Sequence, residues 1–172
     1  MSKKYQKTKN NSHKEIFVII SIIIVFLVGA YLFTPSRKSP ISESQAVESS
    51  AGEGITIVKS DVTDKATFYS YTVEDTYMEV LAIKASDGTI RTALNTCQVC
   101  TGSGRAYYVQ EGDVLVCQNC GNRFTVDQVE VIKGGCNPVP ILGGDKTDDG
   151  ESIRISDEFL ANNKQLFYNW KN

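Results

Sequence analysis

All five cysteines of this 172-residue chain lie between Cys97 and Cys136. Four of them form two Cys-x-x-Cys pairs, Cys97/Cys100 and Cys117/Cys120, with sixteen residues between the pairs. Two such pairs at a separation of about 15–20 residues are typical of a site in which four thiolates hold one metal centre. A hairpin between the pairs would bring the second turn opposite the first. The sequence therefore predicts a metal site made of Cys97, Cys100, Cys117 and Cys120.

The spacing does not name the metal, because soft thiolates in tetrahedral geometry select zinc, iron or an iron–sulfur cluster. We predict that Cys136, in a Gly-Gly-Cys turn, belongs to the cofactor-binding set, either replacing one of the four or lying beside them; the alternative is an unpaired cysteine. Glycine backbone N–H groups, together with Arg105, Arg123 and Lys133, are expected to offset the negative charge of the thiolates.

Four other uses of these cysteines are weighed against a redox metal centre. A structural zinc ribbon would use the same four ligands to recognise another protein. Disulfides would give two bridges and one unpaired cysteine. A thiol-redox motif of the thioredoxin type requires a single Cys-x-x-Cys at the start of a helix, whereas this sequence has two pairs. Covalent haem needs a histidine after the second cysteine, where Thr101 and Gly121 stand.

Composition excludes several classes of function. The only histidine is His13, so Ser-His-Asp and Cys-His catalysis and zinc hydrolysis by His-Glu-x-x-His have no basis in the rest of the chain. The net charge of −2 argues against nucleic-acid binding. No general base or nucleophile is evident beyond the thiols. We therefore expect an electron carrier or binding protein rather than an enzyme.

Residues 16–33 form an uncharged 18-residue run in which fourteen residues are Ile, Val, Leu or Phe. As a helix it would be roughly 27 Å long, which matches the hydrocarbon core of a bilayer. Residues 1–15 carry five Lys and one Glu, which predicts a basic cytoplasmic head and export of the chain beyond residue 33. We expect an uncleaved signal anchor in the cell membrane; the alternative is a cleaved signal peptide.

Residues 34–54 are rich in Ser, Pro, Gly and Glu, which predicts a flexible linker. Residues 55–172 then form a small, mainly β extracytoplasmic domain of the α+β class, with a double-knuckle metal site and a C-terminal helix. Alternating patterns predict eight strands. They are 55–58, 66–73, 76–84, 89–94, 106–110, 114–116, 124–126 and 129–132.

Ser156 is expected to cap the C-terminal helix. On this helix one face, expected to pack on the sheet, is formed by Phe159, Leu166, Phe167 and Trp170. The acidic segment 145–151 is interpreted as a solvated turn.

The cysteine region, together with the segments around it, resembles the FtrD-like family of membrane iron–sulfur proteins. The resemblance covers roughly residues 55–155 and is carried by five motifs. They are Lys84-x2-Asp87-Gly88-x-Ile90-Arg91-x-Ala93, the two Cys-x-x-Cys pairs, the hairpin of Tyr107 and Gly112, Gly121-x2-Phe124, and Gly134-Gly135-Cys136-Asn137-Pro138.

This resemblance implies an extracytoplasmic metal centre, expected to be an iron–sulfur cluster, in a protein held by one membrane helix. It also implies electron transfer linked to iron uptake, because some members accompany iron permeases. The expected partners are thus the lipid bilayer and an iron or other metal permease, or another membrane redox protein. The two ligand pairs and Gly121-x2-Phe124 are also similar to Rieske proteins, with cysteines where Rieske proteins place histidines.

Overall fold

A computed structural model describes residues 52–172 of the chain. The predicted head, the predicted membrane helix and residues 34–51 of the predicted linker lie outside this part. None of the helices between residues 52 and 172 has the length and apolar character that crossing a bilayer requires.

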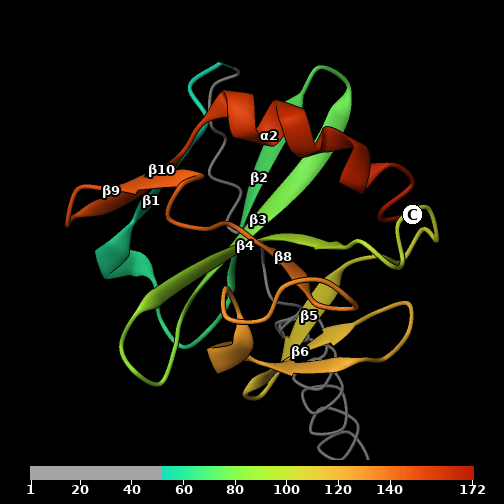
Figure 1. Cartoon of the computed structure of the whole chain (residues 1–172), viewed down its shortest axis with the longest axis horizontal. Helices are drawn as coiled ribbons and strands as arrows, with labels where there is room; N and C mark the ends of the chain where they lie inside the picture. The colour runs from blue at the N-terminus through green and yellow to red at the C-terminus, as the bar shows by residue number, and fades with distance from the viewer. Residues whose placement is uncertain (1–51) are drawn as a thin grey trace, which may run out of the picture. The chain divides into compact units, whose positions relative to one another are not determined.

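The described part is mainly β and contains three antiparallel sheets (Figure 1). The central sheet has the order β2-β3-β4-β8, with β2 at Thr67–Val73, β3 at Thr76–Lys84, β4 at Ile90–Cys97 and β8 at Pro138–Pro140. A second sheet has the order β5-β6-β7, with β5 at Tyr108–Glu111, β6 at Val114–Cys117 and β7 at Arg123–Thr125. The third has the order β1-β10-β9, with β1 at Ile55–Val58, β10 at Ser152–Ile155 and β9 at Lys146–Asp148.

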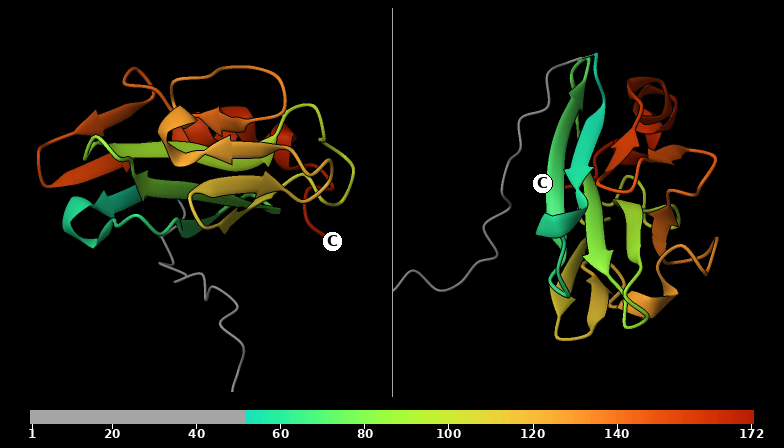
Figure 2. Two further views of the ribbon diagram at one scale, coloured as in Figure 1. Left: turned by 90° about the horizontal axis from the view of Figure 1, so that it is seen from below. Right: turned by 90° about the vertical axis from the view of Figure 1, so that its left-hand side faces the viewer.

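Helix α2 (Asp157–Asn163) and the β5-β6-β7 sheet lie at opposite ends of the central sheet (Figures 1 and 2). Three short 3-10 helices complete the elements, η1 at Lys59–Asp61, η2 at Val126–Gln128 and η3 at Lys164–Phe167. Strand β3 is the centre of the core, because six consecutive residues from Met78 to Ile83 are buried. A strand buried on both faces reads as a continuous run rather than as an alternation. The core therefore lies on both sides of the central sheet.

The strands predicted from the sequence through residue 126 are present, with ends shifted by up to three residues. The strand predicted over 129–132 is wrong. Those residues form a turn after η2, in which the N–H groups of Val131 and Ile132 both donate to the Gln128 carbonyl. Glu130 also has a φ of 65°, which no strand residue adopts. Strands β8, β9 and β10 were not predicted. Proline, which is rare within strands, stands at both ends of β8, and β9 lies in the acidic segment that was interpreted as a turn.

The C-terminal helix begins as the sequence predicts, with the Ser156 hydroxyl accepting a hydrogen bond from the Phe159 N–H at 3.2 Å. It ends at Asn163, so the four aromatic and aliphatic residues of the predicted face do not share one helix. Leu166 and Phe167 lie in η3, and Trp170 follows it. All four still pack on the core, where Phe167 and Trp170 are buried. Leu160, which was not predicted, is fully buried.

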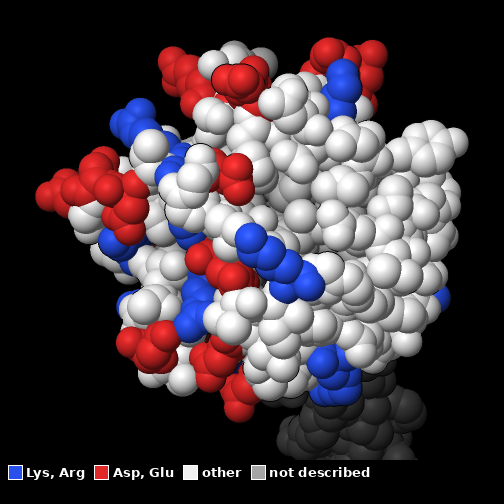
Figure 3. All heavy atoms as spheres, viewed as in Figure 1, with Lys and Arg blue, Asp and Glu red and all other residues white. Residues whose placement is uncertain are grey.

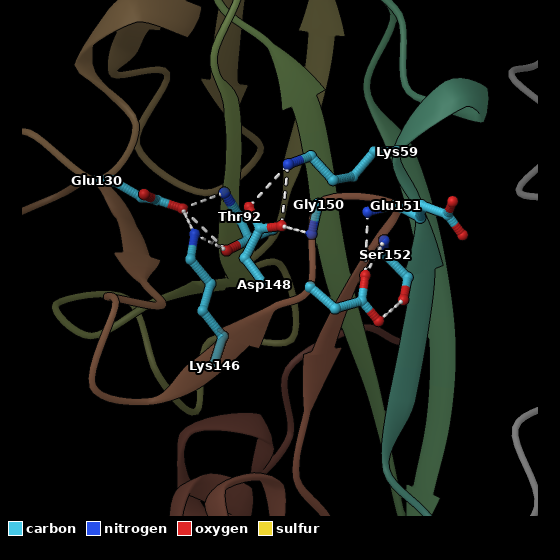
Figure 4. Close-up of polar contacts among 9 residues, drawn as sticks. Lys59, Thr92, Glu130, Lys146, Asp148, Gly150, Glu151 and Ser152 are labelled. Atoms are coloured by element: carbon cyan, nitrogen blue, oxygen red, sulfur yellow. Dashed lines mark hydrogen bonds and ion pairs between the residues drawn. The ribbon is translucent and has the colours of Figure 1, made fainter.

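The acidic segment 145–151 forms β9 and the turn into β10, so the interpretation as a turn is confirmed only for the residues after β9. The carboxylates of Asp148 and Asp149 are occupied by the chain itself (Figure 4). Asp148 accepts from Lys59 Nζ at 2.8 Å, and Asp149 accepts from the backbone N–H and the hydroxyl of Ser152. These carboxylates close a hairpin and are not gathered to bind a cation.

Candidate metal centre

Three separate segments bring the five cysteines together. Cys97 is the last residue of β4, and Cys117 is the last residue of β6. Cys136 stands two residues before β8, whose first residue, Pro138, pairs with Cys97 across the central sheet. The β5–β6 hairpin lies between the two Cys-x-x-Cys turns, as the sequence predicts. Pairing of strands therefore determines where the sulfurs meet.

The Sγ atoms converge on Cys136. Its sulfur lies 2.7 Å from that of Cys120, 3.3 Å from that of Cys97 and 3.9 Å from that of Cys100. The sulfurs of Cys100 and Cys117 are 3.8 Å apart. All five cysteines are free thiols, so the two bridges that the disulfide alternative requires are not formed.

Four of these sulfurs, those of Cys97, Cys100, Cys117 and Cys136, lie within 4.8 Å of one another. This group differs from the predicted quartet by holding Cys136 in place of Cys120. The first three are buried, Cys136 is partly buried, and Cys120 is exposed. The predicted quartet, with Cys120 as a ligand, stays a prediction. The compact group contains the sulfur of Cys136, and Cys120 lies at its exposed edge.

The size of the group fits a metal centre. Four thiolates at about 2.3 Å from one ion form a tetrahedron with edges of about 3.8 Å. Three of the six separations in the group, at 3.3, 3.8 and 3.9 Å, are close to this edge, and none exceeds 4.8 Å. The donor set, made only of thiols, suits zinc, iron and iron–sulfur clusters equally.

Both Cys-x-x-Cys turns are held by their own backbones. The Cys100 N–H donates to the Cys97 carbonyl at 3.1 Å, and the Gly121 N–H donates to the Cys117 carbonyl at 2.9 Å. The same turns direct other N–H groups at sulfur. Those of Asn119 and Cys120 act to lower the pKa of Cys117, and that of Asn122 acts to lower the pKa of Cys120. These donors are backbone N–H groups of residues other than glycine, so the expected donation from the glycines stays a prediction.

The environment separates the thiols into two classes. Burial raises the pKa of Cys100 to about 12, and it also raises those of Cys117 and Cys136. Burial acts in the same direction on Cys97, but the nearby Tyr108 hydroxyl and the neighbouring thiols outweigh it and lower the pKa of that thiol. A hydrogen bond from Cys136 lowers the pKa of Cys120 to about 7. Clustered thiols that resist ionisation together are stabilised as thiolates when a cation is bound among them.

Tyr108 is a residue of the site that sequence analysis missed. Its side chain is among the largest fully buried ones, and it lies opposite Cys117 in the β5–β6 hairpin. Its hydroxyl has no hydrogen-bond partner within residues 52–172. Burial raises the pKa of this phenol, as do the charges of Cys97, Cys117 and Cys136, so it remains a donor. Since buried donors are rarely left unpaired, a Cys97 thiolate is the natural acceptor.

Two asparagines complete the site. The Asn122 side chain donates to the Cys136 carbonyl at 2.8 Å, and that of Asn137 donates to the Ile132 carbonyl at 2.5 Å. Asn122 therefore joins the second Cys-x-x-Cys turn to the loop that carries Cys136. Asn137 belongs to the motif of the family resemblance, but nothing in the spacing singled out Asn122 or Tyr108.

The loops of the site carry no charged side chains. Residues 97–104, 117–122 and 134–144 contain no Asp, Glu, Lys or Arg. The half of the molecule over the ends of β4 and η3 is largely free of charge, whereas acidic side chains gather around the β9–β10 hairpin (Figure 3). Arg123, one of the three cations expected to offset the thiolates, pairs with Glu111 at 2.9 Å instead. The roles expected for Arg105 and Lys133 stay predictions.

A comparison with solved structures found a crystal structure of the quaternary ammonium Rieske monooxygenase CntA bound to an inhibitor. That match has a TM-score of 0.38 and 14% identity, and it covers 62% of this chain and 32% of the other. A likeness of this size carries no inference about this chain. A comparison with curated proteins gave no match.

A family model described as "Membrane iron-sulfur containing protein FtrD-like" matches residues 62–167. This range includes all five cysteines and Tyr108, and it is more than half of the chain. The resemblance stated from the sequence motifs is thereby confirmed. The chain belongs to the FtrD-like family of membrane iron–sulfur proteins.

Proposed function

We propose that this protein is an extracytoplasmic electron-transfer protein, anchored in the cell membrane, whose thiols hold an iron–sulfur cluster or an iron ion. The observation that carries the proposal is the convergence of five free thiols from three segments at one point. Membership of a family described as iron–sulfur proteins supports iron over other metals. When bound, such a centre supplies one-electron oxidation and reduction.

The chain's own residues would do three things for this centre. Cys97, Cys100, Cys117 and Cys136 would supply four thiolates, because their sulfurs form the compact group. The backbone N–H groups of the second turn and the Tyr108 hydroxyl would donate hydrogen bonds to sulfur, which favours the reduced state. Burial of three of the four cysteines would keep bulk water away from the metal.

Cys120 has a different place in this proposal. Its sulfur is exposed and lies 2.7 Å from that of Cys136. We assign it to the solvent-facing edge, where a short path would lead from the ligands to a partner. The predicted quartet with Cys120 as the fourth ligand is the competing assignment, and the two differ in which serine variant keeps the metal.

A structural zinc site is the second candidate, and the compactness of the sulfur group favours it. Separations of 3.3–3.9 Å match the edge of a tetrahedron around one ion, which is about 3.8 Å for zinc. A bound zinc ion would contribute about 10–16 kcal/mol to folding and no redox activity.

The membrane part of the proposal rests on the sequence. Residues 16–33 would span the bilayer with the basic head in the cytoplasm, and residues 34–54 would let the domain reach a membrane partner. An iron or other metal permease, or a membrane redox protein, is the partner we propose. Intact mass of the purified membrane protein tests the anchor, because loss of roughly thirty residues would reveal a cleaved signal peptide.

The central test is purification of the full chain without oxygen, followed by metal analysis. An iron protein will be coloured and give an electron paramagnetic resonance signal in one of its two redox states. A colourless protein with one zinc per chain would replace the electron-transfer proposal with the structural one. Absence of any stoichiometric metal would remove both.

A further inference from the structure

Glu79 is a carboxylate buried in the middle of β3, with a side chain that is 4% exposed. Three side chains surround its oxygens, and one of them is Tyr77, whose hydroxyl donates to Oε1 at 3.2 Å. Lys171 Nζ donates to Oε1 at 3.0 Å, and Asn95 Nδ2 donates to Oε2 at 2.8 Å. A buried carboxylate is costly unless it is paired and hydrogen-bonded, so this arrangement fixes Glu79 between the C-terminal segment and β4.

Asn95 links Glu79 to Tyr108 by hydrogen bonds from the two ends of its amide. It is 1% exposed, and its Oδ1 accepts from the backbone N–H of Tyr108 at 2.9 Å. Because the Asn95 amide nitrogen must face the carboxylate, its oxygen must face Tyr108. Glu79 therefore sets the orientation of the amide that holds Tyr108.

Tyr108 is the first residue of β5, so a hydrogen bond to its N–H locates the start of that strand. Cys97 is two residues beyond Asn95 on β4, and its own N–H donates to the Ala106 carbonyl at 3.0 Å. Asn95 and Cys97 thus hold residues 106–108 at two points. The position of the Tyr108 phenol relative to the Cys97 sulfur depends on both.

Lys171 anchors the outer end of this contact. Its Nζ lies 4.9 Å from the centre of the Tyr107 ring and 5.3 Å from that of Trp170. Backbone hydrogen bonds join the same segment to the first cysteine loop, with the Ala106 N–H donating to the Trp170 carbonyl at 2.9 Å and the Gly104 N–H to the Asn169 carbonyl at 2.7 Å.

We propose that Glu79 is a positioning residue of the metal centre, which acts through Asn95 to hold the Tyr108 hydroxyl against the Cys97 sulfur. Lys171, Glu79, Asn95 and Tyr108 form one polar chain that runs from the exposed Lys171 through three buried residues toward Cys97. This inference rests on the proposed function only in requiring a metal at Cys97. It holds whether the native metal is iron or zinc.

The test uses the full chain with its metal replaced by Co²⁺, because thiolate-to-cobalt charge-transfer bands report the electron density on sulfur for either native metal. Tyr108→Phe removes the hydroxyl that donates to sulfur, so the band will move to lower energy. Glu79→Leu will move it in the same direction by at least about half as much, since the hydroxyl is displaced rather than removed. In iron-loaded protein both variants will lower the reduction potential.

Rescue and coupling separate positioning from a general loss of structure. Glu79→Gln keeps an acceptor for Asn95 and will return the band close to that of the unchanged protein. The Glu79→Leu, Tyr108→Phe double variant will show the shift of Tyr108→Phe alone, because residues that act through one another are not additive. Glu74→Gln is the matched control, since its pair with Lys164 is exposed, and it will leave the band unchanged.

Two results would overturn the inference: an unshifted band in Glu79→Leu, or a double variant whose shift is the sum of the single shifts. If Glu79→Leu does not fold, Lys171→Met at the exposed end serves instead, with the same direction of shift expected and an unshifted band counting against the chain. A chain that takes up no Co²⁺ at all contradicts the proposed metal centre. A normal cobalt band that does not move in Glu79→Leu contradicts only this inference.

Discussion

Cys97 and Cys136 are 39 residues apart in the sequence, yet their Sγ atoms lie 3.3 Å apart. The contact follows from the pairing of β4 with β8, which places Pro138 opposite Cys97. A sulfur fixed by the central sheet is better suited to hold a metal than one on an exposed turn, because rigid elements preserve ligand geometry. Cys136 lies two residues before β8 and thus next to such an element, whereas Cys120 lies on an exposed turn.

Serine variants of these two cysteines should therefore behave differently. Cys136→Ser will lose at least about nine-tenths of the bound metal after purification, because it removes one of four converging ligands. Cys120→Ser will retain most of it. Metal per chain, measured by mass spectrometry on both proteins, decides between them. Retention by Cys136→Ser with loss by Cys120→Ser would restore the quartet predicted from the two Cys-x-x-Cys pairs.

Replacing Glu130 should destabilise the domain. Its carboxylate accepts from the backbone N–H of Thr92 at 2.5 Å and from the Thr92 hydroxyl at 2.9 Å, and it pairs with Lys146 (Figure 4). Glu130→Ala leaves these largely buried donors unpaired, so we expect a loss of about 3 kcal/mol in the free energy of unfolding.

Denaturant unfolding of three variants measures this effect. Glu130→Gln keeps an acceptor for Thr92 and should lose less than Glu130→Ala. Lys164→Ala breaks the exposed pair with Glu74 and should change the free energy by about 0.5 kcal/mol or less. Equal losses of unfolding free energy in Glu130→Ala and Lys164→Ala would show that the contacts of Glu130 with Thr92 and Lys146 contribute no more than an exposed ion pair.

Helix α2 is expected to depend on one residue for its attachment to the core. Leu160 is fully buried, so Leu160→Ala should lower the free energy of unfolding by about 2–5 kcal/mol through lost contacts and a cavity. The exposed neighbour Asn162, changed to Ala, should alter it by less than about 0.5 kcal/mol. Thermal unfolding followed by circular dichroism compares the two, and a Leu160→Ala protein as stable as Asn162→Ala would contradict the packing described.

The turn at Asp87 should stabilise the fold in a pH-dependent way. Hydrogen bonds from the hydroxyl and N–H of Thr89, with Arg91 nearby, lower the pKa of Asp87 to about 2. A carboxylate with a depressed folded-state pKa stabilises above the unfolded pKa of about 3.9 and stops doing so as the pH falls through the folded value. Asp87→Asn should therefore be less stable at pH 7, with the difference shrinking between about pH 4 and pH 2. Urea unfolding at several pH values measures this, and a constant difference down to pH 2 would rule the mechanism out.

Much of the fold could be predicted because its strands obey simple local rules. The alternation over β2 and β3 and the Ser-Asp-Gly turn after Lys84 are local signals. The Ser156 cap is local as well, and the structure contains it. The error over 129–132 has a physical source. Val129, Val131 and Ile132 favour a strand by type, but the η2 turn and the ion pair of Glu130 with Lys146 override that preference.

The candidate site was predictable only where its signals are local in the sequence. Spacing identifies the two Cys-x-x-Cys turns because each is local, and the β5–β6 hairpin brings them together. The place of Cys136 depends on β4–β8 pairing, and that of Tyr108 depends on Asn95. Such contacts join residues distant in sequence, for which a single sequence carries no periodic signal.

The pairing of β1 with β10 has a consequence for how the protein should be refolded. Ile55 lies opposite Ile155 in this sheet, so one hundred residues must be in place before the first strand finds its partner. Domains dominated by such distant pairings fold slowly. During that interval five nucleophilic sulfurs would be open to oxidants, so refolding in the presence of dithiothreitol should recover more native protein than refolding in air.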